Sequence, residues 1–188
     1  MSASTPDLAR LVGEIGGGTC PGLAQTFDRR LINGTLAPAT GTMYLSAIWM
    51  PAGMTVTNIN LYTGGTGVTT NTHNWAALYA IDPSTSVAKL LAQSTDDITG
   101  ADYAANTKVT KTLTAAQTLT YTGMYYIAWM QAATTPALIA AATAPASSIA
   151  NNDTPIPSAS SSTGQGASAP SPAGALTAII QSFYAYVN

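Results

Sequence analysis

The chain has 188 residues, of which 46% are hydrophobic and only 7% are charged, and its formal net charge is -2. Ordinary soluble domains carry about 25% charged residues, so clustered ionisable groups are scarce here. The six Lys and Arg residues are scattered, which excludes the stripe of cations that nucleic-acid binding needs.

Two long stretches contain almost no charge. Apart from His73, no ionisable basic or acidic side chain lies between Arg30 and Asp82, and after Lys111 the only one is Asp153. Thr, Ser, Ala, Asn and Gly fill these stretches. We therefore expect a protein that works packed against neighbours, because uncharged surfaces meet without desolvating charges.

We expect neither a membrane span nor a secretory signal. No stretch approaches the roughly 18 uninterrupted apolar residues of a transmembrane helix. The N-terminus, MSASTPDLAR, lacks a basic segment followed by an apolar one. The length suits one domain of good size.

The first predicted element is a short helix that begins near Thr5 and Pro6 and ends at the glycines of residues 16–18. Its apolar stripe consists of Leu8, Leu11, Val12 and Ile15. So short a helix needs a surface to lie on, either its own domain or a neighbouring subunit. Residues 1–40 are interpreted as this helix and a connecting arm.

Residues 41–140 are predicted to form an antiparallel β-sandwich, jelly-roll-like in type. Apolar and Thr-rich runs recur every 8–15 residues or so with turn residues between them, which is typical of sandwiches and barrels. The expected strands are residues 43–50, 54–62, 74–81, 87–93, 107–113, 118–121 and 123–131.

The last part of the chain changes composition twice. Residues 141–174 are rich in Ala, Ser, Pro and Thr, which predicts a long extended loop. Such a loop is unusual in a compact domain, so we expect it to lie along a neighbouring subunit. Residues 175–188 are predicted to be a strand that returns to the sheet or pairs with a neighbour. Its aromatic residues, Phe183, Tyr184 and Tyr186, are candidate partner-interface residues.

Three blocks resemble a β-sandwich domain of tailed-bacteriophage virion proteins, especially minor tail proteins of actinobacterial phages. They are GTMYLSAIWMPAGMTVTNINLYTGG (residues 41–65), NWAALYAIDPSTSVAKLLAQS (74–94) and YTGMYYIAWMQAATTPAL (121–138). The resemblance covers a little over half of the chain and rests on strands and turns, not on a catalytic signature. It implies a structural role on the outer surface of a virion head or tail.

Residue chemistry gives little support to catalysis. His73 is the only histidine, Cys20 the only cysteine and Glu14 the only glutamate. These residues do not provide a nucleophile–base pair, a zinc site or a glycosidase acid pair. The acidic loop with Asp96, Asp97 and Asp102 admits calcium, but its spacing is not that of an EF-hand, and a solvated loop is the preferred reading. We expect no enzyme activity, no metal and no cofactor.

The leading hypothesis is a non-enzymatic virion protein, either a capsid decoration or a minor tail subunit. It would bind major capsid or tail subunits through its terminal segments and associate with itself, with threefold symmetry preferred. The alternative is a glycan-binding host-attachment module that uses Trp49, Trp75 or Trp129 for stacking. Burial of all three tryptophans would exclude stacking on them.

Overall fold

The computed structural model describes residues 24–82, 84–85, 87–143, 156–161 and 163–188. The predicted N-terminal helix, with Leu8, Leu11, Val12 and Ile15, lies outside these residues. Within them the fold is mainly β, and every strand pair is antiparallel, as expected from the sequence. None of the described residues forms a helix long and apolar enough to cross a membrane.

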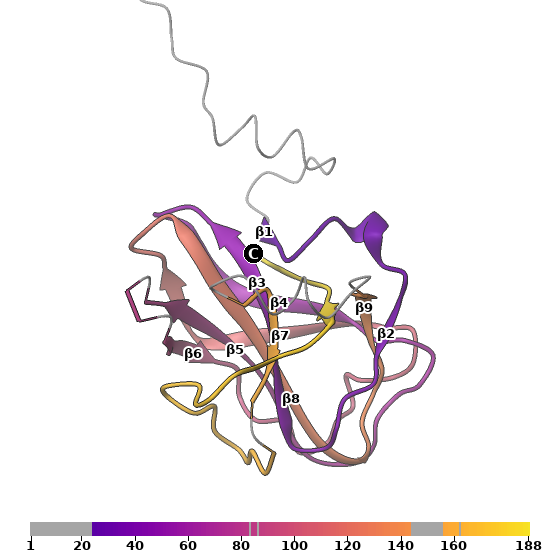
Figure 1. The fold of residues 1–188 in the computed structure, drawn as a ribbon. Helices are drawn as coiled ribbons and strands as arrows, with labels where there is room; N and C mark the ends of the chain where they lie inside the picture. Colours follow the sequence, from indigo (N-terminus) through magenta and orange to yellow (C-terminus); the bar gives the residue numbers. More distant parts are fainter. Residues whose placement is uncertain (1–23, 83, 86, 144–155, 162) are drawn as a thin grey trace, which may run out of the picture.

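The strands form three sheets (Figure 1). The six-stranded sheet, in the order β11-β10-β3-β8-β5-β6, contains β3 (Thr42–Met50), β5 (Thr69–Ile81), β6 (Ala88–Gln93), β8 (Gly123–Thr135), β10 (Ser158–Ser160) and β11 (Thr177–Ala178). The four-stranded sheet, in the order β1-β13-β4-β7, contains β1 (Ala24–Gln25), β4 (Thr55–Tyr62), β7 (Lys108–Thr118) and β13 (Ala185–Val187). The three-stranded sheet, in the order β12-β9-β2, contains β2 (Gly34–Leu36), β9 (Ile139–Thr143) and β12 (Gln181–Phe183). A single 3-10 turn, η1 (Arg29–Leu31), follows β1.

The main core lies between the six-stranded and four-stranded sheets. Val56, Ile59 and Leu61 of β4 are fully buried, and they share one cluster with Ile127 and Trp129 of β8. Successive side chains of a strand point to opposite faces, so each sheet contributes every second residue to this core. Two sheets that face each other across a common core fit a β-sandwich.

The six-stranded sheet is buried on its other face as well. In β8, Tyr125 belongs to the main core, whereas the next residue, Tyr126, belongs to a second cluster with Trp75 and Tyr79 of β5. The two tyrosines therefore point to opposite faces, as their sequence positions predict. Burial on both faces explains why β3, most of β8 and residues 75–81 of β5 are almost continuously apolar rather than alternating.

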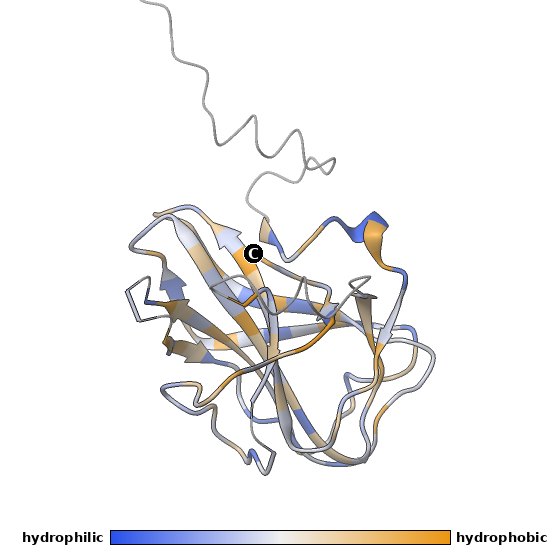
Figure 2. Ribbon diagram, viewed as in Figure 1, coloured by the Kyte–Doolittle hydropathy of each residue, from blue (hydrophilic) through white to orange (hydrophobic). Residues whose placement is uncertain are grey.

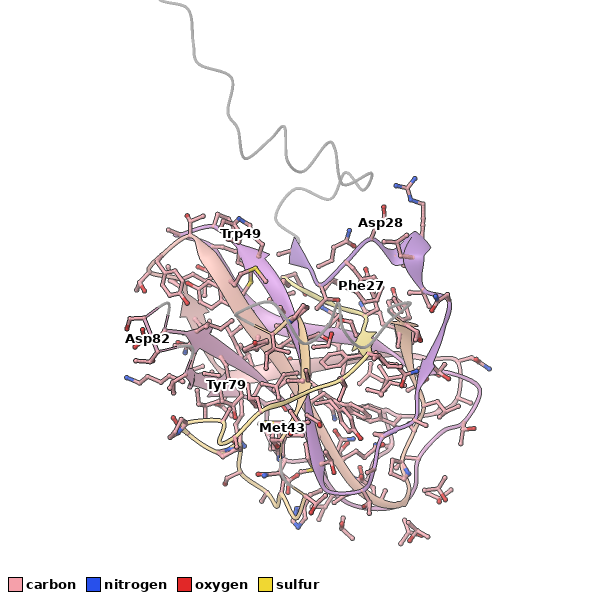
Figure 3. All side chains as sticks on the ribbon, viewed as in Figure 1. Phe27, Asp28, Met43, Trp49, Tyr79 and Asp82 are labelled. Carbon is pink, nitrogen blue, oxygen red and sulfur yellow. The ribbon has the colours of Figure 1, made fainter. Side chains whose placement is uncertain are left out.

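The chain's own residues 156–161 and 163–174 cover this second cluster. Trp75 Nε1 donates to the Gly166 carbonyl at 2.8 Å, and the Tyr79 hydroxyl donates to the Pro170 carbonyl at 2.7 Å. In Figure 3, Tyr79 and Met43 lie where the yellow C-terminal segment crosses the sheet. Residues 156–161 and 163–174 of the predicted loop therefore lie against the chain's own sheet, where aromatic side chains bind them. Contact of the loop with a neighbouring subunit stays a prediction.

The C-terminal residues also differ from the prediction. Instead of one strand, residues 177–187 form β11, β12 and β13, one in each of the three sheets. β13 pairs with β1 and β4 of the same chain, so this segment returns to its own fold. Likewise, β1 and β2 lie in the predicted arm and pair with β13 and β9, which places the described part of the arm within the domain.

We predict that the Tyr79→Phe variant destabilises the domain by about 1 kcal/mol, because the Pro170 carbonyl loses its donor. Urea unfolding measures the loss, and limited proteolysis should cut faster within residues 163–174. Tyr62→Phe is the matched control, since no hydrogen bond of the Tyr62 hydroxyl is found within the described residues. Equal stability and equal proteolysis of the two variants would show that this bond does not fasten the segment.

Candidate interaction surfaces

The three tryptophans have different environments. Trp75 and Trp129 are completely buried, and Trp129 Nε1 donates to the Tyr103 hydroxyl at 3.1 Å. Trp49, at the end of β3, leaves 58% of its surface exposed (Figure 3). Stacking of a sugar ring is therefore excluded on Trp75 and Trp129 and stays open only for Trp49.

The aromatic residues proposed for a partner interface do not form one exposed set. Phe183 is completely buried in the main core, and Tyr184 is only 4% exposed. Both rings are therefore enclosed by the chain itself, because β12 and β13 pair with strands of the same chain. Tyr186 is half-buried. Leu8, Leu11, Val12 and Ile15 lie outside the described residues.

Tyr184 lies at the centre of an aromatic group at one side of the four-stranded sheet. Its ring centroid lies 5.6 Å from that of Phe27, 6.0 Å from that of Tyr62 and 6.3 Å from that of Tyr186. We call Phe27, Tyr62, Tyr184 and Tyr186 the tyrosine face. Leu61 and Ala185 belong to the core, so the neighbouring Tyr62 and Tyr186 point to the outer face of the sheet.

Hydrogen bonds and cations hold the tyrosine face. The Tyr184 hydroxyl donates to Gln25 Oε1 at 3.1 Å, and burial raises the pKa of this phenol, with Arg29 acting in the opposite direction. Lys108 Nζ lies 5.6 Å from the centre of the Tyr186 ring, and a hydrogen bond to Tyr186 raises the pKa of Lys108. The face thus combines partly exposed rings with fixed positive charges.

Paired polar side chains cover the outer face where β4 and β7 meet. Thr112 donates to Asn58 at 2.8 Å and Thr110 to Asn60 at 2.9 Å. The hydroxyls of Thr55 and Thr118 lie 3.0 Å apart. We call these three cross-strand pairs the Asn/Thr ladder. Its groups bond to one another, so contact with another protein there leaves few of them unsatisfied.

The acidic loop is held by a buried lysine. Lys111 is only 5% exposed, and its Nζ lies 3.2 Å from Asp97 and 3.5 Å from Asp102, over the Tyr103 ring at 5.0 Å. The ammonium group lies between the two carboxylates where a calcium ion would need to bind. The described residues also contain no group of three or more His, Cys, Asp or Glu side chains suited to a metal. The loop borders a shallow depression of about 390 Å³.

His73 also contacts this loop. Its Nδ1 lies 2.7 Å from Asp96 Oδ2, while Asp96 Oδ1 accepts the Asn74 backbone N–H at 2.8 Å. No hydroxyl or thiol bonds to His73 among the described residues, so the nucleophile of a catalytic triad has no counterpart in this part of the chain. The pair ties the acidic loop to β5.

Two buried amides face each other across β5 and β8. Asn74 and Gln131 are paired in register, and both are completely buried. Asn74 Nδ2 and Oδ1 and Gln131 Nε2 have no hydrogen-bond partner within the described residues. The Asn74 amide comes near the Tyr103 hydroxyl without bonding to it. Buried amides without partners lower stability.

No local sequence pattern marks these surfaces. Tyr62 and Tyr186 are far apart in the chain, and only the pairing of β4 with β13 brings them together. Phe27 follows β1 and Lys108 begins β7, so these two residues come from the two edges of the same sheet. The alternation of β7 places the Lys111 side chain on the inner face of the sheet. The sequence alone does not show that the acidic loop lies there and supplies carboxylates for this lysine.

We predict that the stability of the domain falls as pH is lowered from the ordinary carboxyl pKa of 3.8 toward about 2, the pKa of Asp97. Burial raises this pKa, but hydrogen bonds from Thr99 and the Lys111 charge outweigh burial and lower it. A lowered folded-state pKa stabilises the ionised form, so the stabilisation is complete above the unfolded pKa and disappears on acidification. Solvent screening reduces this contribution to about 1 kcal/mol.

Asp97→Asn tests the origin of this pH dependence, because an amide oxygen can still accept the Thr99 and Gly100 bonds. Urea unfolding at several pH values should give a flatter acid limb for Asp97→Asn than for the wild type or Lys89→Gln. An unchanged acid limb would contradict the assignment.

We predict that Asn74→Leu stabilises the domain by about 1 kcal/mol, since it removes unpartnered amide atoms. Asn60→Leu is the matched control. That asparagine is 1% exposed, but its amide bonds to Asn188 and Thr110, so its replacement should destabilise the domain. Thermal unfolding compares the two. Destabilisation by both would mean that the Asn74 amide is satisfied in solution.

Comparison with known proteins identifies no family for this chain. No protein-family model matches it. No curated protein matches it significantly either. What the surfaces do must therefore be argued from their own chemistry.

Proposed function

We propose that this chain is a non-enzymatic structural subunit of a bacteriophage virion, located on the outer surface of the head or tail. In this proposal the subunit binds capsid or tail proteins through its N-terminal residues, including Leu8, Leu11, Val12 and Ile15, and through self-association as a trimer. The domain is a jelly-roll-like sandwich with a short N-terminal helix. The subunit acts by binding other subunits and does not catalyse a reaction.

The observation that carries this proposal is the Asn/Thr ladder on an open sheet face. Polar side chains lose hydrogen bonds to water when an interface forms, and the free-energy cost of this desolvation is largest for charged groups. Here the side chains of Asn58, Asn60 and their partners already bond across β4 and β7. Another subunit can cover the Asn/Thr ladder itself without desolvating a charge, because none of its six side chains is ionisable. In Figure 2 much of the ribbon is pale, which agrees with a chain rich in Thr, Ser, Ala and Gly.

The sequence blocks that resemble phage virion domains support the same proposal. Residues 41–65 form β3 and β4, residues 74–94 form most of β5 and all of β6, and residues 121–138 form β8. These strands include β3, β8 and β5, which are consecutive in the six-stranded sheet, and β4, which is one of the two strands of the ladder. The resemblance therefore concerns the framework of the domain.

A glycan-binding host-attachment role is the second candidate. The exposure of Trp49 favours it, because an indole face in solvent is the kind of surface on which a sugar ring stacks. Such a role is compatible with a place on the outside of a particle.

The proposal is tested on phage particles induced or propagated from the source of the sequence and banded by density. Quantitative mass spectrometry should find this chain in the particles at a fixed ratio to the major capsid or tail protein. Resistance to a high-salt wash is expected, since the proposed contacts contain few charges. Recovery of the chain only in the unbanded lysate would contradict the proposal.

A further inference from the structure

We propose that the tyrosine face, with Lys108 and Arg29 at its flanks, binds an acidic polysaccharide by stacking of sugar rings and pairing of carboxylates. This inference goes beyond a structural role, and it does not require the chain to lie in a virion. It also concerns a different surface from Trp49.

The tyrosine rings form a contiguous row whose members are tilted by 34° to 44° to one another. Tyr62 and Tyr186 are half-buried with ring centroids 6.4 Å apart, and the buried Tyr184 supports both from beside them. Phe27 continues the row toward β1. The four strands of this sheet span about 14 Å at the usual spacing, enough for a short run of sugar rings. Tyrosine offers a flat apolar face for stacking together with a hydroxyl for hydrogen bonding.

The charges around the tyrosine face favour an anion. Lys108 is exposed beside Tyr186, and Arg29 is exposed near Tyr184. Arg29 has no ion-pair partner in the described part of the chain, whereas Arg30 is held by Asp28 at 2.6 Å. Lys108 and Arg29 are thus the two cations beside the rings that no carboxylate of the described residues holds in an ion pair, although the whole chain has a net charge of -2.

The other acids of the described loops do not cancel this charge locally. Asp97 and Asp102 pair with Lys111, whose side chain points to the inner side of β7, and Asp96 pairs with His73. Lys108 lies on the outer side of β7. A carboxylate on a bound sugar would thus meet Lys108 or Arg29 at either flank of the tyrosine face. Rings and cations together distinguish an acidic polysaccharide from a neutral one.

Isothermal calorimetry with three probes tests the assignment: polygalacturonate, neutral dextran and a single-stranded oligothymidylate. The wild-type chain should bind polygalacturonate, and this binding should weaken as the salt concentration rises. It should bind dextran at least tenfold more weakly, because neutral dextran lacks carboxylates and a lost charge pair lowers affinity by roughly tenfold. Oligothymidylate serves as the competing polyanion, because its bases also stack on aromatic rings. Tighter binding of oligothymidylate than of polygalacturonate would overturn the assignment, as would no binding of polygalacturonate or equal binding of dextran.

Substitutions locate the site. Lys108→Gln and Arg29→Gln alter exposed side chains and should each weaken polygalacturonate binding by about threefold to tenfold. Tyr186→Ala should abolish binding, while Tyr186→Phe keeps the ring and should retain most of it. Lys89→Gln, an exposed lysine on β6, is the matched control and should bind like the wild type. Unfolding midpoints exclude loss of fold. Unchanged binding by both Lys108→Gln and Arg29→Gln would overturn the proposal.

Discussion

The six-stranded sheet is buried on both faces, and this double burial sets how the other elements pack. The four-stranded sheet covers one face, and the chain's own residues 156–161 and 163–174 cover the other. The aromatic side chains Trp75, Tyr79 and Tyr126 fill the second layer and use their polar ends to bind backbone carbonyls of the covering segment. A large ring can be buried here because its single polar atom is satisfied.

This double burial decides which surfaces remain for contact. With the six-stranded sheet enclosed, the outer face of the four-stranded sheet is the broad sheet surface that the described residues leave open. One part of that face carries the Asn/Thr ladder, whose polar groups bond to each other. Another part carries the tyrosine face with Lys108 and Arg29 at its flanks. We propose different partners for the two parts, a protein neighbour for the ladder and a charged sugar polymer for the rings.

The sequence predicts the strands well because their signals are local. Predicted residues 43–50, 54–62 and 123–131 agree closely with β3, β4 and the start of β8, since apolar runs between turn residues fix them. The expected short strand at residues 118–121 is instead the end of β7 and a turn, because Tyr121 turns back to bond with Ile81. The position of residues 156–161 and 163–174 depends on contacts with residues distant in sequence. Ala159, Ala169 and Ala173 look like loop composition, yet each is buried against the sheet.

The candidate surfaces were less predictable for the same reason. Three tryptophans in predicted strands have the same local signature, and only packing separates the exposed Trp49 from the buried pair. Phe183 and Tyr184 are adjacent, so a single strand would place them on opposite faces. Both are buried instead, because β12 and β13 belong to different sheets. Charge scarcity, in contrast, is visible directly in the composition, and it gives the most direct link between this sequence and a role in assembly.

A cryo-electron microscopy reconstruction of the particle would show whether this domain works by contact through the uncharged Asn/Thr ladder. We expect density for the domain in symmetric copies on the outside of the particle, with the ladder of β4 and β7 against neighbouring protein. A particle without this domain would contradict the account. So would a domain that attaches by its acidic loop while the ladder faces solvent.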